Sequence, residues 1–291
     1  MNIIVGASGQ VGSHIIKELH RKGHRARAIV RHDRKVQQLG VDFVVADLMD
    51  ADQVANAFQG GSTAFIITPE DPTSKDIIGP TKQIIENYAK AIKSAGVKKI
   101  VGLSCIGAQV ESGTGNIIMS RMLEQGFDGL DITRVFIRPS YFYSNWLAFL
   151  EPGEQHGVFP SFFPADLKFD MNSPIDVAAR IVDVITYASS NETEIIEVAG
   201  PEKYSVRDVA SVFSHLLGKK VYPQLIPTAK RIETLLHAGF SFDAAQNLSE
   251  MTQALIDGVA RPEHPARLVR LTTTLKQYLQ QKIKGALSKS N

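Results

Sequence analysis

The sequence has few of the features that mark secreted, membrane-spanning or nucleic-acid-binding proteins. Its 291 residues include one cysteine, Cys105, which excludes an internal disulfide and a multi-cysteine metal site. No run of about 18 apolar residues is present to span a bilayer, and the histidines show no HExxH-like pairing, so we expect no metal. A net charge of +2 provides no electrostatic attraction for nucleic acid or an anionic membrane. No signal-peptide pattern precedes the first predicted strand, so we expect a cytoplasmic protein.

The most informative feature that is present is a glycine-rich turn near the amino terminus. The segment Asn2–Val5 predicts a short buried strand that runs into the turn, and a helical pattern follows over 10–22. The first amides of such a helix have no intrahelical partner, so a pyrophosphate is expected there. The alternative is a βα turn with a purely structural role. The predicted cofactor-binding residues of the turn are Gly6, Ser8, Gly9, Gln10, Val11 and Gly12.

The three glycines are expected to have different tasks. Gly6 would permit the tight turn, Gly9 would let the backbone approach the phosphates, and Gly12 would let helix and strand pack closely. Ser8 and Gln10 would add side-chain donors.

Basic residues after the second predicted strand favour NADP(H) over NAD(H). An NAD-selective fold usually has an acidic residue at this strand end, whereas here the strand ends in Arg31. A guanidinium group pairs with a 2′-phosphate that a carboxylate would repel. The alternative is that Arg31, Arg34 and Lys35 form only a solvated charged loop.

Two residues after the third predicted strand complete the expected adenine side of the site. Asp47 would face the adenine edge, and Leu48 would pack on it. Asp47 would equally serve as the N-cap of the helix that begins near Asp50.

Short apolar runs alternate with helical patterns, which predicts an α/β fold with a doubly wound, parallel Rossmann sheet. Residues 1–150, with 175–200 returning to the same sheet, would form an NAD(P)-binding domain, and the rest of 151–291 a smaller, mostly helical domain for a substrate or partner. Strands are predicted at 2–5, 27–30, 41–46, 63–68, 99–104, 132–137 and 194–198, and helices at 10–22, 51–58, 80–95 and 116–125.

Parallel sheets bind ligands at the carboxyl ends of their strands. Thr68 and Pro69 end the fourth predicted strand and Ser104 ends the fifth, so these three residues join the predicted cofactor site.

A loop-rich insertion is predicted over 151–174, where prolines and glycines accompany four phenylalanines. Its aromatic side chains would either fill the core between the domains or line an apolar pocket. The predicted substrate pocket contains Tyr141, Phe142, Phe162 and Phe163.

Five segments distributed over the chain carry a family resemblance: Gly6-Ala-Ser-Gly9-Gln-Val-Gly12, Ala95-Gly-Val-Lys-Lys-Ile-Val101 with Leu103-Ser104, Arg138-Pro-Ser-Tyr-Phe142, Val198-Ala-Gly-Pro201-Glu and Gly239-Phe-Ser-Phe-Asp. They resemble the NmrA-like group of atypical short-chain dehydrogenase/reductases, and the resemblance covers essentially the whole chain. It implies an NAD(P)-binding Rossmann domain with a small substrate domain. The group includes quinone and dye reductases, relatives of isoflavone reductase and redox-sensing regulators, so it implies the cofactor better than the reaction.

The wider superfamily transfers protons with a Tyr-x-x-x-Lys pair on the helix after the fifth strand. In this chain the two positions fall on Asn116 and Ser120, and neither side chain acts as an acid or carries charge near neutral pH. The catalytic candidates are Asn116, as an orienting residue, Ser104, whose hydroxyl would orient a substrate carbonyl, and Tyr141. A satisfied strand-end hydroxyl is the alternative for Ser104, and Cys105 is predicted to be a small buried hydrophobe.

Two functions remain open from the sequence. One is an NADPH-dependent reductase that passes hydride to a flat acceptor such as a quinone, which would take its proton from water. The other is a non-catalytic NADP(H) sensor whose small domain contacts a protein. The aromatic segment Phe159–Phe163 favours the reductase, because it could stack a planar substrate. The expected partners are a small-molecule acceptor and either a protein or a second copy of the chain, without nucleic acid or membrane.

Overall fold

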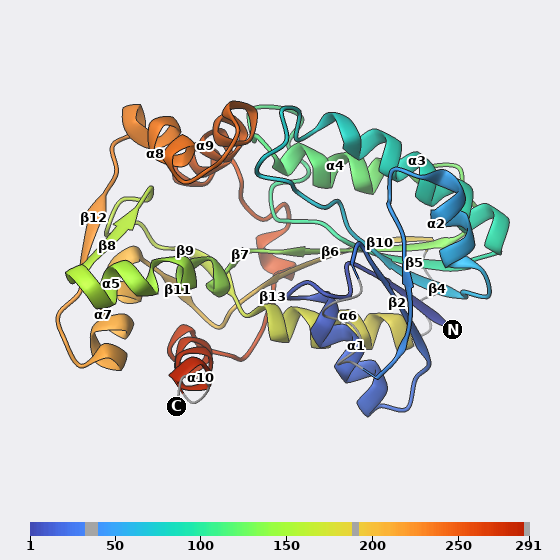
Figure 1. Cartoon of the computed structure of the whole chain (residues 1–291), viewed down its shortest axis with the longest axis horizontal. Coiled ribbons are helices and arrows are strands. Elements are labelled where there is room, and N and C mark those ends of the chain that lie inside the picture. Colours follow the sequence, from blue (N-terminus) through green and yellow to red (C-terminus); the bar gives the residue numbers. More distant parts are fainter. Residues whose placement is uncertain (33–39, 188–191, 288–291) are drawn as a thin grey trace.

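The computed structural model describes residues 1–32, 40–187 and 192–287. Its centre is an eight-stranded sheet in the order β13-β10-β6-β5-β4-β1-β2-β3, with every neighbouring pair parallel (Figure 1). The strand order reverses between β1 and β4, so the predicted doubly wound α/β fold is confirmed. The strands are β1 Asn2–Val5, β2 Ala26–Val30, β3 Asp42–Val45, β4 Thr63–Ile66, β5 Lys99–Leu103, β6 Thr133–Pro139, β10 Thr193–Ala199 and β13 Val269–Arg270.

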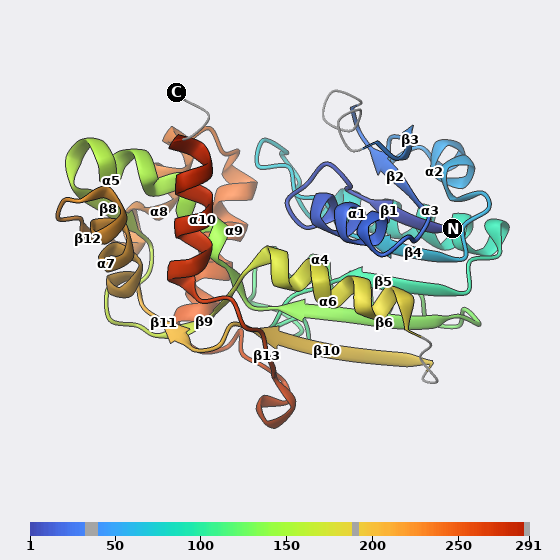
Figure 2. The ribbon, with the colours of Figure 1, turned by 90° about the horizontal axis from the view of Figure 1, so that it is seen from below.

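Helices cover both faces of this sheet, as Figures 1 and 2 show. Alternate side chains of a strand point to opposite faces. In β1, Ile4 therefore packs in the core beneath α1 and α6, and Ile3 and Val5 pack in the core beneath α2, α3 and α4. The helices are α1 Gly12–Arg21, α6 Pro174–Thr186, α2 Ala51–Phe58, α3 Gly79–Ala95 and α4 Ile117–Gln125.

The second half of the chain adds two small sheets and further helices beyond the carboxyl edge of the large sheet (Figure 1). Their shared core is aromatic, with Trp146, Phe159 and Phe213 almost fully buried. One sheet has the order β11-β9-β7 and the other pairs β12 with β8. These elements are β7 Tyr141–Phe142, β8 Val158–Ser161, β9 Phe169–Asn172, β11 Lys203–Tyr204, β12 Tyr222–Leu225, α5 Leu150–His156, α7 Val206–Leu217, α8 Arg231–His237, α9 Phe242–Ile256 and α10 Leu275–Leu287, with 3₁₀ turns at Tyr143–Phe149, Thr228–Lys230 and Pro265–Arg267.

The structure corrects the prediction that residues 151–174 are mainly loop. This stretch contains most of α5 and the strands β8 and β9. The reason is long-range pairing: β8 forms parallel hydrogen bonds with β12, so that Val158 lies opposite Tyr222. Local composition carries no information about that partner.

The short strand β13 was not predicted from the sequence. It adds to the free edge of β10, where Val198 lies opposite Val269, and Figure 2 shows it at the border of the large sheet. None of the helices in the described ranges has the length and apolar character needed to cross a bilayer.

Candidate functional site

The glycine turn begins where β1 ends. Gly6 has φ of +67°, in the left-handed region that favours glycine, and its carbonyl accepts a 2.9 Å hydrogen bond from the Gly9 amide. A Cβ added at Gly12 would lie 2.3 Å from the Gly6 oxygen, whereas one added at Gly9 would lie 3.2 Å from it. The backbone geometry therefore requires glycine at position 12 for packing, while Gly9 has open space on its outer side.

The first turn of α1 fits a bound pyrophosphate. No side chain caps this helix end, and no acidic residue lies in its first turn to repel an anion. Ser8, Gly9 and Gln10 are exposed, whereas the side chain of Val11 is buried in the core. Of the predicted turn residues, Gly9 and Gln10 line a cavity of about 720 Å³ that is described below.

The expected adenine side of the site lies farther along the same edge. Arg31 is exposed directly after β2, and Arg34 and Lys35 lie outside the described residues. Leu48 is buried, and the exposed Asp47 accepts a 2.9 Å hydrogen bond from the amide of Met49.

The N-cap of α2 is Asp50 and not Asp47. The carboxylate of Asp50 accepts hydrogen bonds of 3.0 Å from the amides of Asp52 and Gln53. This leaves the carboxylate of Asp47 facing solvent, with the Met49 amide as its hydrogen-bond donor.

A cavity of about 720 Å³ extends from the glycine turn along the carboxyl ends of β4, β5 and β6. Its opposite wall comes from α9 and the segment that follows it. The first wall contains Gly9, Gln10, Ile67, Thr68, Pro69, Glu70, Leu103, Ser104, Cys105, Ile106, Asn116, Ser120, Tyr141 and Phe142, and the second contains Met251, Leu255, Ile256, Gly258, Ala260, Arg261 and Pro262.

Ser104 lies in this wall, but its hydroxyl proton already takes part in a hydrogen bond within the protein. The Ser104 hydroxyl is buried and donates a 2.5 Å hydrogen bond to Oε1 of Glu124. The geometry therefore favours the alternative of a satisfied strand-end hydroxyl over an orienting donor for a substrate carbonyl.

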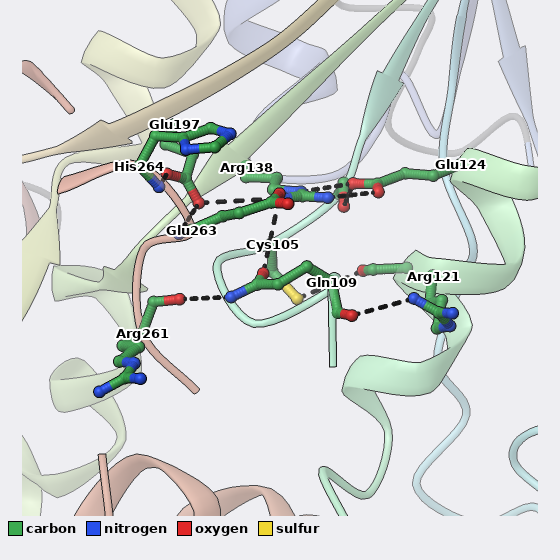
Figure 3. Close-up of polar contacts among 11 residues, drawn as sticks. Cys105, Gln109, Arg121, Glu124, Arg138, Glu197, Arg261, Glu263 and His264 are labelled. Carbon is green, nitrogen blue, oxygen red and sulfur yellow. Dashed lines mark hydrogen bonds and ion pairs between the residues drawn. The ribbon is translucent and has the colours of Figure 1, made fainter. Parts of the chain in front are cut away.

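Behind Ser104 lies a buried charge cluster centred on Arg138 (Figure 3). Its guanidinium donates from Nε and Nη2 to Glu124 at 2.8 and 2.7 Å, and from Nη1 to Glu263 at 2.6 Å. Glu197 lies opposite Arg138 in the pairing of β10 with β6, at 3.7 Å from Nη1. Burial by itself lowers the pKa of Arg138, but hydrogen bonds and ion pairing with Glu124 and Glu263 outweigh it and raise that pKa.

This cluster holds the second cavity wall against the sheet. The carboxylate of Glu197 accepts from the amides of Glu263 and His264 at 2.9 and 3.0 Å, and Gln109 donates a 2.8 Å hydrogen bond to the carbonyl of Arg261 (Figure 3). The cluster was not predicted from the sequence. Its only local signal is one charged residue within each of two apolar strands, the basic Arg138 in one and the acidic Glu197 in the other.

Asn116 is brought to the cavity at the start of α4 and is 6% exposed. Its Nδ2 donates a 2.9 Å hydrogen bond to Oε2 of Glu70, and its Oδ1 is buried without a partner among the described residues. Burial raises the pKa of the Glu70 carboxyl, and the hydrogen bond from Asn116 partly opposes this effect. Glu70 is not among the site residues predicted from the sequence, although it directly follows Thr68 and Pro69.

Ser120 and Cys105 form a second polar contact in the cavity wall. The thiol of Cys105 donates to the Ser120 hydroxyl at 3.3 Å. Burial raises the pKa of Cys105 to about 12, which keeps the thiol protonated and makes it a poor nucleophile.

The predicted substrate pocket is brought together only in part. Tyr141 and Phe142 line the cavity, and burial raises the pKa of Tyr141 to about 12. Phe163 instead packs in the aromatic core, 5.5 Å from the Tyr141 ring, while the Phe162 carbonyl accepts from Arg231. Neither Phe162 nor Phe163 lines this cavity, in contrast to the prediction. Phe163 packs in the core of the small sheets, and Phe162 is half-buried outside that core.

Comparison with known proteins identifies the relationships of this chain. A model of the NmrA-like family matches residues 2–279. An NAD(P)H azoreductase from Xenophilus azovorans is 25% identical over 258 residues, covering 86% of each chain. A crystal structure of an NADPH-dependent quinone oxidoreductase from Escherichia coli superposes with a TM-score of 0.78 at 25% identity, over 97% of this chain and 100% of the other. A Citrobacter triphenylmethane reductase in complex with NADP(H) has a TM-score of 0.77 at 21% identity, over 96% and 99%.

Proposed function

The chain belongs to the NmrA-like family, and from this premise and the cavity we propose that it is an NADP(H)-dependent oxidoreductase acting on a flat, conjugated small molecule such as a quinone. The observation that carries the proposal is one continuous cavity of about 720 Å³ that joins the glycine turn to an apolar pocket. Hydride transfer needs the reacting atoms within about 3.5 Å of one another, so cofactor and acceptor must share one space.

The chain offers suitable groups for the cofactor. When bound, NADPH supplies a hydride, which carries two electrons. The amides of Ser13 and His14 already donate to the carbonyls of Gly9 and Val11, so the Gly12 amide and the exposed Ser8 and Gln10 would hold the pyrophosphate. The exposed guanidinium of Arg31 would pair with the 2′-phosphate and favour NADPH over NADH. The named activities of the azoreductase and the quinone oxidoreductase agree with such a cofactor.

The walls of the cavity suit a planar acceptor. Apolar side chains of Met251, Leu255 and Ile256 lie on one wall, and Tyr141 and Phe142 lie on the other. In this proposal, residues 1–150 and 175–200 form the cofactor domain, and the remainder of 151–291 forms the substrate domain. The aromatic segment over 159–163 supports the acceptor wall from behind and does not touch the acceptor.

The test separates binding from turnover. NADPH and NADH are titrated into the purified protein by calorimetry, and NADPH oxidation is then followed by absorbance with quinones, an azo dye and a simple ketone. We expect tight NADPH binding and rapid oxidation with at least one quinone, and neither in a folded Gly9→Val protein, whose branched side chain fills the phosphate side of the turn. Tight NADPH binding without turnover of any acceptor would contradict the proposal and favour the non-catalytic sensor.

A further inference from the structure

The cavity wall contains two acidic side chains, Glu70 and Asp170, and Asp170 is paired with Arg270. Glu70 follows β4 and lines the same cavity as Gly9 and Gln10 of the glycine turn. Its Oε2 accepts the hydrogen bond from Asn116, whereas its Oε1 accepts none from the described residues. None of the ion pairs within the described ranges involves Glu70.

The contact with Asn116 decides which oxygen of Glu70 can carry a proton. An amide NH₂ group only donates, so Oε2 must act as an acceptor, and a proton on this carboxyl belongs on Oε1. The resemblance to the superfamily implies that its tyrosine acid falls on Asn116. The carboxyl group of Glu70 lies one hydrogen bond away from that expected position.

The surroundings of Glu70 favour its protonated form. Burial is the larger influence on its pKa and raises it, and the hydrogen bond from Asn116 is a smaller, opposing one. The other titratable side chains that line the cavity are Cys105, Tyr141, Lys168, Asp170, Lys203 and Arg261. Of the cations in this set, Lys168 and Arg261 are exposed, and Lys203 lies 3.9 Å from Asp170.

We infer that Glu70 is the proton donor of the proposed reduction and that Asn116 positions it. This inference rests on the proposed function. As the hydride reaches the acceptor, the Oε1–H bond of Glu70 breaks and its proton moves to the acceptor oxygen that gains charge. A quinone that receives one hydride and one proton becomes a neutral hydroquinone. The Glu70 carboxylate then regains its proton from water, so atoms and charge balance.

The first test removes the acid and keeps its shape. Glu70→Gln retains an oxygen that accepts from Asn116 but cannot release a proton at neutral pH, so turnover with 1,4-naphthoquinone should fall about 100-fold, at the lower end of what general acids contribute. Binding of NADPH, measured by calorimetry, should change less than about threefold, which is a small fraction of the binding free energy. Glu86→Gln is the matched control, because Glu86 is exposed on α3, away from the cavity, and should leave turnover unchanged.

The second test uses pH and does not depend on turnover alone. Because the protonated form is the donor, wild-type turnover should fall as pH rises through the pKa of Glu70, while the Glu70→Gln profile should lack this decline. Carbon NMR of labelled glutamate in the cofactor-free protein should show one carboxyl with a pKa above the ordinary value of about 4.3, absent from the Glu70→Gln spectrum. Asn116→Ala removes the opposing hydrogen bond, so it should raise this pKa further and move the decline in turnover to higher pH.

Asn116→Ala should also lower the plateau rate about tenfold, because the acid is less well oriented. An ordinary pKa for Glu70, or unchanged turnover and pH profile in Glu70→Gln, would overturn the inference while wild-type quinone reduction keeps the proposed function. Absence of wild-type turnover with every acceptor would overturn both.

Discussion

Removing the cation of the buried cluster should destabilise the protein strongly. In Arg138→Met the aliphatic part of the side chain is kept, but the carboxylates of Glu124 and Glu197 lose their cation. The exposed side-chain fractions are 3% for Arg138, 10% for Glu124 and 5% for Glu197, so water can compensate little. Breaking a buried ion pair from one side costs about 3–5 kcal/mol, and two charge-assisted hydrogen bonds to Glu124 account for a loss of this size.

The measurement is urea unfolding followed by circular dichroism and by the fluorescence of Trp146, the only tryptophan. A loss of about 3–5 kcal/mol leaves a folded protein when the starting stability lies in the upper part of the usual range of about 5–15 kcal/mol. The second cavity wall should loosen as well, because Glu263 accepts from Arg138 directly. Proteolysis after Arg261 or Arg267 should therefore become faster in the variant.

A matched exposed pair provides the control. Arg207 contacts Asp166 through the same two-pronged geometry, at 2.6 and 3.0 Å, but the two side chains are 61% and 76% exposed. Arg207→Met should therefore leave the unfolding midpoint almost unchanged. Equal losses in Arg138→Met and Arg207→Met, or a loss below about 1 kcal/mol in Arg138→Met, would refute the reasoning from burial.

Three further predictions concern the glycine turn, Arg31 and the thiol of Cys105. Gly9→Val should remain folded by circular dichroism yet lose NADPH binding in calorimetry, whereas Gly12→Ala, whose Cβ would meet the Gly6 oxygen at 2.3 Å, should lose about 1–3 kcal/mol of unfolding free energy in urea. Wild-type protein should bind NADPH at least about tenfold more tightly than NADH, and Arg31→Asp should abolish this preference; equal wild-type affinities would instead favour a solvated loop. Cys105 is half-buried in the cavity wall, and burial raises the pKa of its thiol to about 12. The native thiol should therefore react far more slowly with iodoacetamide at pH 8 than the unfolded one, and equal rates would contradict the raised pKa.

Local patterns in the sequence determined the large sheet and its glycine turn. The predicted strand Asn2–Val5 matches β1, and the helix expected at 51–58 matches α2. Such elements follow from apolar periodicity and capping within a few residues. The tight turn at Gly6 has a positive φ, which residues other than glycine rarely adopt, so the glycine itself indicates the turn.

The members of the polar clusters could not be predicted in the same way. Glu70 follows β4 and Asn116 lies at the start of α4, and their hydrogen bond spans 46 residues of chain. Arg138 on β6 pairs with Glu124, which lies on α4, and with Glu197, which lies on the neighbouring strand β10. Contacts between such distant side chains depend on the order and register of the strands. Local sequence patterns do not specify either of them.

The α/β class and the glycine turn after the first strand could be predicted from the sequence, because each is a property of neighbouring residues. The sequence alone does not reveal that Phe163 belongs to a core, that Ser104 donates to Glu124, or that Glu70 lies beside Asn116; these features are visible only in the folded protein. These outcomes depend on the packing of distant segments, where burial and unsatisfied hydrogen-bond groups select one arrangement among many that local propensity allows.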